Sequence, residues 1–133
     1  MDKVLLDRLA ADFPEVKFSY GKKFLFRPPN KIMLGPEEPH DSLLLLHELG
    51  HFLCGHRNFY TEPERIKMER AAWVKAKELC RNYGIEYDEE VVEGELDTYR
   101  SYLDQRSRCP KCGLTRYQTR DGVFHCPKCE NDI

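Results

Sequence analysis

The chain has 133 residues, with 33% charged and 41% hydrophobic side chains and a formal net charge of −2. This length is enough for one compact domain with a small appendage, and the near-neutral charge excludes a general electrostatic attraction to nucleic acids or membranes. The longest apolar run, residues 43–46, is far too short to cross a bilayer, and the N-terminus lacks the pattern of a signal peptide. We therefore expect a cytoplasmic protein that has no membrane contact.

The N-terminal part of the sequence predicts one helix and a small sheet. Apolar residues recur at helical spacing in residues 3–12, so we expect a short amphipathic helix that ends before Pro14. Gly21 and the Pro-Pro-Asn segment at residues 28–30 mark turns between short strand-like stretches. These stretches predict three strands in a small antiparallel meander, at residues 16–20, 23–27 and 31–34.

The middle of the chain predicts a buried helix. It is expected to begin near Asp41 or Ser42, either of which can cap its N-terminus, and to run to about Cys54 before Gly55 stops it. The apolar residues of this segment lie almost all round the helix, which indicates a central, buried position.

Two further helices are expected before the cysteine-rich tail. Thr61 and Glu64 have the spacing of a capping box, so the third helix is expected to begin at Thr61. Gly84 suits the position that follows its C-terminal end. A fourth helix is expected over residues 88–104, followed by a polar joint to the tail.

The second helix carries a chemical motif, His47-Glu48-Leu49-Gly50-His51. The two histidines are four residues apart, so a helix presents both imidazoles on one face, where they can bind one metal ion. This is the H-E-x-x-H signature of zinc peptidases. Zinc in such a site lowers the pKa of its bound water to roughly 7 and polarises the scissile carbonyl. Glu48 is predicted to take the proton from this water as the general base.

A catalytic zinc also needs a third protein ligand. No histidine occurs between Arg57 and Phe124, so the candidates are Glu62, Glu64 and Glu69. Glu69 lies in the middle of an apolar stripe on the third helix, where a lone carboxylate needs a cation. We therefore predict Glu69 as the third ligand and Glu62 as the alternative, since Glu64 is explained by the capping box. The stripe comprises Ile66, Trp73, Ala76, Cys80 and Tyr83.

Two residues near the motif have several possible roles. Cys54 lies two turns after His47 and could bind the metal or act as a redox switch, but we expect a small core residue. His56 follows the predicted end of the helix and could contact substrate, although we expect a structural or solvent-facing role.

These motifs resemble the ImmA/IrrE family of metallopeptidases, in particular its short forms in prophages and other mobile elements. The resemblance covers about residues 1–103. It is carried by the His-Glu motif at residues 47–51, by Gly55-His56, and by Glu69 with Ala72, Trp73 and Ala76.

The resemblance implies an α+β, gluzincin-like fold in which a small sheet packs on an active-site helix and a glutamate-bearing helix. Carried over by position, it implies zinc ligands at His47, His51 and Glu69 and the general base at Glu48. Characterised members of the family cut repressor-type DNA-binding regulators, often encoded next door. The implied substrate is therefore a helix-turn-helix repressor. Many members are paired with a helix-turn-helix region, whereas this chain carries a cysteine-rich tail.

The tail carries a second set of metal-ligand residues. Its two C-P-K-C knuckles contain Cys109, Cys112, Cys126 and Cys129. In a chain without a secretion signal, paired C-x-x-C units indicate a metal site rather than disulfides. Four thiolates around one ion are typical of structural Zn²⁺, with rubredoxin-like iron as the alternative. We therefore expect two zinc ions per chain, one catalytic and one structural.

The knuckles define a second predicted domain. The residues between them suit a hairpin that turns at Asp121-Gly122. So small a tail cannot build its own core, and metal binding would supply its folding energy. We therefore predict a metallopeptidase domain at residues 1–104 and a zinc ribbon at residues 105–133.

The role of the ribbon is open at the level of sequence. Basic residues outnumber acidic ones in it, and Tyr117 and Phe124 lie among them, which suits contact with nucleic acid. However, four thiolates and one Zn²⁺ leave two negative charges, so the ribbon is only weakly basic, and a docking or structural role is equally expected.

Two other functions compete with a repressor-cutting peptidase. The SprT family of DNA-associated proteases also joins H-E-x-x-H to a C-terminal ribbon, but it uses a third histidine that this chain lacks. The other alternative is a non-catalytic zinc-binding adaptor, against which the intact ligand and base set argues.

Overall fold

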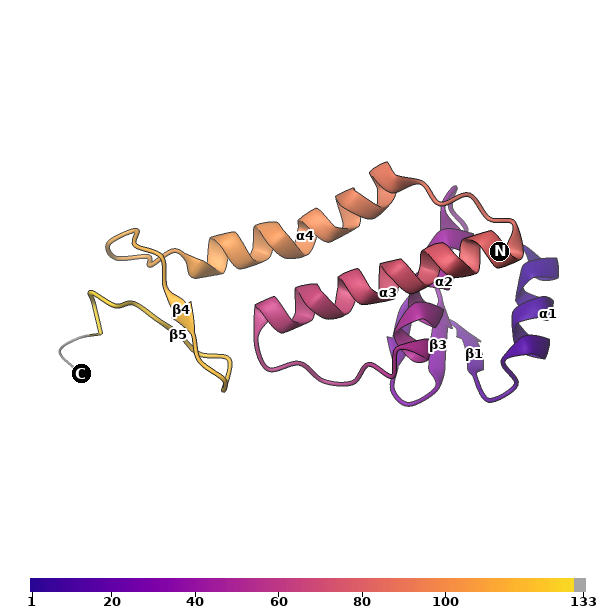
Figure 1. The fold of residues 1–133 in the computed structure, drawn as a ribbon, viewed down its shortest axis with the longest axis horizontal. Coiled ribbons are helices and arrows are strands. Elements are labelled where there is room, and N and C mark those ends of the chain that lie inside the picture. The colour runs from indigo at the N-terminus through magenta and orange to yellow at the C-terminus, as the bar shows by residue number, and fades with distance from the viewer. Residues whose placement is uncertain (131–133) are drawn as a thin grey trace. The chain divides into compact units, whose positions relative to one another are not determined.

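The computed structural model describes residues 1–130 and has an α+β fold with four helices and two small sheets (Figure 1). The helices are α1 (Lys3–Asp12), α2 (Asp41–Leu53), α3 (Glu62–Tyr83) and α4 (Glu89–Ser107). The strands are β1 (Lys17–Tyr20), β2 (Leu25–Arg27), β3 (Lys31–Leu34), β4 (Tyr117–Gln118) and β5 (Phe124–His125). The predicted α+β class is confirmed. No helix in the described part of the chain combines the length and the apolar character needed to cross a membrane.

The described chain divides into two compact units. The first comprises residues 1–57 and 70–88, and the second comprises residues 58–69 and 89 onward. Helix α3 therefore contributes its N-terminal part to the second unit and its C-terminal part to the first. The boundary expected between residues 104 and 105 stays a prediction.

The sheet of the first unit has β3 in its centre, with β1 parallel and β2 antiparallel to it. The predicted antiparallel meander is therefore wrong, because a meander would place β2 between the other two strands. Burial explains the observed order. Ile32 and Leu34 of β3 have no exposed surface, whereas β1 and β2 contain only half-buried and exposed residues and suit the edges. The strand with the most apolar burial takes the position that is paired on both sides.

Helix α2 packs against β2 and β3, and its residues 45–51 are all buried. Leu45, Leu46 and Leu49 have no exposed surface, so the predicted buried position of this helix is confirmed. The expected cap is wrong, because the N-cap residue is His40 and its side chain makes no capping hydrogen bond. Gly55 ends the helical turn with a φ of 68°, a conformation that glycine adopts without strain.

Helix α3 begins with half of the predicted capping box, because Thr61 caps the helix as expected but the Glu64 carboxylate accepts from the N–H of Tyr60 rather than of Thr61. The hydroxyl of Thr61 accepts a hydrogen bond from the Glu64 N–H at 3.3 Å, and the Glu64 carboxylate accepts one from the Tyr60 N–H at 3.1 Å. Gly84 follows the last helical residue with a φ of 69°, as predicted. Helix α4 continues to Ser107, three residues beyond the expected end at residue 104.

Candidate metal centres

The motif of α2 brings three metal-ligand side chains together. His47, Glu48 and His51 are 7%, 8% and 8% exposed, and one donor atom from each lies within 4.8 Å of the others. We call these residues the histidine group. Two imidazoles and a carboxylate, all buried, form a donor set that fits a borderline cation such as Zn²⁺. The group can therefore hold a metal ion.

A close approach between α2 and α3 shapes the histidine group. A Cβ atom at Gly50 would collide with the carbonyl oxygen of Ala72, so only glycine lets the two helices come this near. The next residue of α3, Trp73, stacks on the His47 ring with 4.0 Å between ring centroids and 6° between planes. Trp73 is 2% exposed, so its buried ring restricts the orientation of the His47 ring.

Glu48 is anchored through both carboxylate oxygens. Its Oε1 accepts a hydrogen bond from the Phe26 N–H of β2 at 2.9 Å, and its Oε2 lies 3.0 Å from His47 Nδ1. The short edge strand β2 therefore orients the residue predicted as the general base. A carboxylate beside Nδ1 favours the tautomer that carries its proton there, so His47 would bind an ion through Nε2.

His51 has a different partner. Its Nδ1 lies 2.9 Å from Nδ1 of His56, and the Phe26 ring stacks on its other side, with centroids 6.2 Å apart and 6° between planes. The sequence favoured a structural or solvent-facing role for His56 and missed this contact. The turn at Gly55 was the signal available, because it reverses the chain and returns the next residue towards the end of α2.

Glu69, the predicted third ligand, is buried at 7% exposure on α3, one helical turn before Trp73. Its assignment as a ligand stays a prediction. The alternative ligand, Glu62, lies in the first turn of α3, 3.7 Å from the Arg65 guanidinium.

Cys54 does not match its expected role. Its side chain is exposed rather than part of the core. The helix ends at Leu53, so Cys54 falls in the turn that follows, where the buried face no longer continues.

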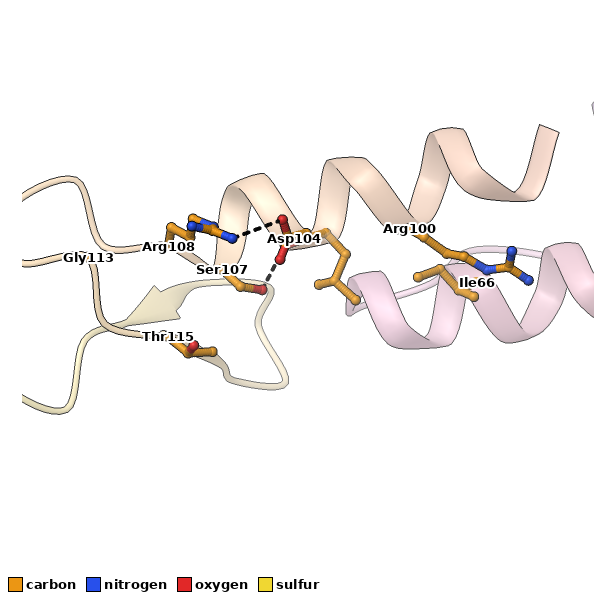
Figure 2. Close-up of a pocket in the computed structure, with 8 residues that line it drawn as sticks. Ile66, Arg100, Asp104, Ser107, Arg108, Gly113 and Thr115 are labelled. Atoms are coloured by element: carbon orange, nitrogen blue, oxygen red, sulfur yellow. Dashed lines mark hydrogen bonds and ion pairs between the residues drawn. The ribbon is translucent and has the colours of Figure 1, made fainter. Parts of the chain in front are cut away.

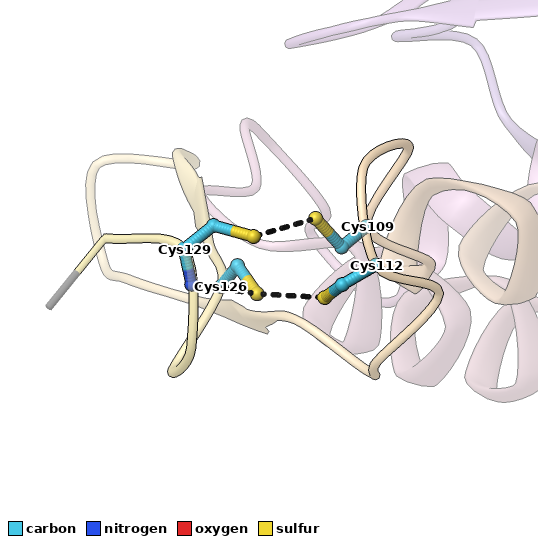
Figure 3. A group of neighbouring side chains, drawn as sticks. All are labelled: Cys109, Cys112, Cys126 and Cys129. Atoms are coloured by element: carbon cyan, nitrogen blue, oxygen red, sulfur yellow. Dashed lines mark hydrogen bonds between the residues drawn. The ribbon is translucent and has the colours of Figure 1, made fainter.

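The four cysteines of the tail converge as predicted (Figure 3). We call Cys109, Cys112, Cys126 and Cys129 the cysteine cluster. The sulfurs of Cys109 and Cys129 are 3.7 Å apart, and those of Cys112 and Cys126 are 3.6 Å apart. A tetrahedron with Zn–S bonds of about 2.3 Å has S···S edges of about 3.8 Å. The cluster thus fits one tetrahedral metal ion and a zinc ribbon.

The knuckles also supply backbone donors to the sulfurs. The N–H groups of Cys112 and Lys111 lower the pKa of the Cys109 thiol to about 6, and the N–H of Cys129 lowers the pKa of Cys126. Hydrogen bonds of the Cys129 thiol with the neighbouring sulfurs instead hold its proton and raise its pKa to about 12. Only a cation at the centre would let all four sulfurs carry their charge together.

The hairpin of the tail is tied to the start of α3 inside the second unit. The side-chain oxygen of Gln118 in β4 accepts a hydrogen bond from the Glu62 N–H at 2.7 Å, and its amide nitrogen donates to the Gly122 carbonyl at 2.9 Å. A Cβ atom at Gly122 would lie 3.1 Å from the Tyr60 carbonyl oxygen, so the turn also packs closely on this segment. The hairpin therefore satisfies the first N–H of α3, whereas Thr61 satisfies the N–H of Glu64.

An open groove of about 500 Å³ lies in the second unit, lined by residues of α3, α4 and the tail (Figure 2). Ile66 and Leu103 supply its apolar part. Both lining arginines are already engaged: Arg108 lies 3.6 Å from Asp104, and Arg100 makes 2.8 Å ion pairs with two acids of its own helix. No residue of the histidine group or the cysteine cluster lines the groove.

Comparison with known proteins identifies no relative: no family model, no curated protein and no solved structure matches the chain. The functional assignment therefore depends on the chemistry of the two groups.

Proposed function

We propose that the protein is a zinc-dependent endopeptidase of the ImmA/IrrE type, with a gluzincin-like core and a C-terminal zinc ribbon. The observation that carries this proposal is the histidine group, in which two buried imidazoles and a buried carboxylate meet on one helix. Their i, i+1 and i+4 positions are those of the H-E-x-x-H motif. Burying three such groups costs free energy unless hydrogen bonds or a bound cation compensate for the lost contact with water.

We assign Glu69 as the third ligand. Its carboxylate is buried on α3, one turn before the tryptophan that stacks on His47. Burial of a carboxylate is favourable only with compensating charge or hydrogen bonds, which a cation supplies. Glu62 is the weaker candidate, because it lies beside Arg65 in the first turn of the helix, where acidic residues are favoured in any case.

The chain's own residues would carry the proton transfers. A bound zinc ion would lower the pKa of water and polarise the scissile carbonyl. Glu48 would take the proton from the attacking water and pass it to the leaving amine. The Phe26 N–H, 2.9 Å from one oxygen of this carboxylate, fixes its orientation. Trp73 and Phe26 restrict the rings of His47 and His51, so the ligands are held before substrate arrives.

The resemblance of the motifs supports a protein substrate, a helix-turn-helix repressor, and a cytoplasmic site of action. For the cysteine cluster we propose a structural Zn²⁺, since its S···S separations are close to the edge of a zinc–thiolate tetrahedron. The protein would then carry two zinc ions.

The test combines metal analysis with cleavage. The purified protein should contain two zinc ions per chain and should cut the product of the neighbouring gene, which we expect to be a helix-turn-helix repressor. Glu48→Gln should retain both ions and the fold but cleave roughly 10²–10⁴-fold more slowly, because the base is lost and the ligands are not. Elemental analysis, circular dichroism and gel assays of the repressor measure these three quantities.

Two further variants separate the possible outcomes. His51→Ala should lose one zinc ion and all cleavage, whereas His40→Ala, outside the motif, should lose neither. Full cleavage by Glu48→Gln would show that the mechanism is wrong. A wild-type protein with one zinc, held by the cysteine cluster alone, would instead favour a non-catalytic adaptor.

A further inference from the structure

The residue after the end of α2 returns to one of the proposed metal ligands. Gly55 adopts a φ of 68°, and the N–H of His56 donates to the carbonyl oxygen of His51 at 3.1 Å. This turn brings the two rings to 5.1 Å between centroids, with 63° between planes. The Nδ1 atoms are 2.9 Å apart, which is hydrogen-bonding distance.

Two imidazole nitrogens at this distance must have different roles. One carries the shared proton and donates, and the other accepts. The orientation of His51 is further fixed by Phe26, whose ring is nearly parallel to it, and by burial at 8% exposure. The His51–His56 pair is thus a defined geometry rather than a chance approach of two mobile side chains.

The proposed metal site decides which ring donates. If His51 binds the ion through Nε2, its neutral ring must carry the proton on Nδ1, and His56 must accept that proton's hydrogen bond. Ligating histidines commonly donate their second N–H to an acceptor, which fixes the tautomer and makes the ligand more basic. His47 has Glu48 beside its Nδ1 at 3.0 Å, so the two ligands would have different supporting partners.

We propose that His56 is a positioning residue that fixes the tautomer and the ring orientation of His51 for metal binding. This inference rests on the proposed metal site, and it assigns to His56 a role in metal affinity rather than in the chemical step. The acceptor is His56 Nδ1, so a side chain without an acceptor atom at that position should lower the zinc affinity of the histidine group.

A pair of variants isolates the acceptor. His56→Phe keeps an aromatic ring without a nitrogen, and His56→Asn keeps an acceptor close to the position of Nδ1 without the ring. We expect His56→Phe to bind zinc at the histidine group roughly 10–100-fold more weakly, and His56→Asn to recover most of this loss. Competition with a chromophoric chelator measures the affinity, and circular dichroism of both variants is the control for folding.

A second measurement uses the unmodified protein. In the zinc-loaded state, ¹⁵N shifts of the imidazole of His51 should show a protonated Nδ1 and a metal-bound Nε2. Unchanged zinc affinity in His56→Phe, or an ion bound at His51 Nδ1, would overturn the positioning role while leaving the peptidase proposal intact. Absence of zinc from the histidine group of the wild type would overturn both. A wild type that binds two zinc ions but cuts no repressor would contradict only the proposed function.

Discussion

The histidine group and the cysteine cluster gather their donor atoms by different means. The three residues of the histidine group lie within five consecutive positions of one helix, so the helix alone brings them close together. The cysteine cluster joins two knuckles that are separated by the β4–β5 hairpin. The histidine group lies in a packed core, whereas Leu114, Tyr117 and Val123 of the tail are exposed and Phe124 is its buried large apolar side chain. Metal should therefore be optional for the fold of one region and essential for that of the other.

Removal of one thiolate should have the largest effect. Cys126→Ser leaves three sulfurs around the ion, so we expect loss of the tail's zinc and unfolding of the β4–β5 hairpin. Zinc content should fall by one ion per chain, and the amide signals of the hairpin should move to random-coil positions while those of α2 stay. Cys54→Ser changes an exposed cysteine outside the cluster and should do neither. A hairpin that keeps its dispersed signals after loss of the ion would contradict the idea that metal supplies its stability.

Zinc binding at the histidine group should instead depend on the packing of α2 against α3. Gly50→Ala places a methyl group against the Ala72 carbonyl, so we expect a destabilisation of about 1–3 kcal/mol and weaker zinc binding at His47 and His51. Gly94→Ala is the matched control, because it also lies within a helix but meets nothing within 4 Å. The control should stabilise the protein by up to about 1 kcal/mol through helix propensity. Urea denaturation measures both, and equal effects of the two changes would disprove the close helix contact.

The smallest predicted effect concerns the link between the hairpin and α3. Gln118→Ala removes the acceptor of the Glu62 N–H, and we expect a loss of about 1 kcal/mol. The Thr61 cap remains, so only the first turn of α3 should fray. Hydrogen exchange at the Glu62 amide reports this, with the exposed Gln105→Ala as the control. If exchange at Glu62 is unchanged, the hairpin does not cap the helix.

Local patterns predicted most of the candidate sites. The i, i+4 histidines, the two knuckles, the Thr61 cap and the glycine at the end of α3 follow from spacing along the chain, and each has the predicted geometry. Each depends on residues a few positions apart, or on metal chemistry that joins two such units. The α+β class followed in the same way from helical periodicity and short strand-like stretches.

Features that depend on long-range packing were not predicted. The order of the sheet reflects which strand is buried on both sides, and nothing in the turn residues specifies that choice. Trp73 was placed on the buried stripe of its helix, but its stacking on His47 depends on the approach allowed by Gly50. The contact of His56 with His51 is local but was also missed, because it depends on how the turn at Gly55 directs the next side chain. The ligand role of Glu69 stays a prediction, although the burial expected for it is observed.

The way the chain passes between its two units has a consequence for biosynthesis. Residues 58–69 belong to the second unit, yet the rest of that unit begins only at residue 89. On a ribosome, this segment therefore emerges before Gln118, which accepts the hydrogen bond of the first N–H of α3, although the Thr61 cap can form within the segment itself. The first unit can assemble as soon as residue 88 leaves the exit tunnel, whereas the second must wait for the knuckle that carries Cys126 and Cys129.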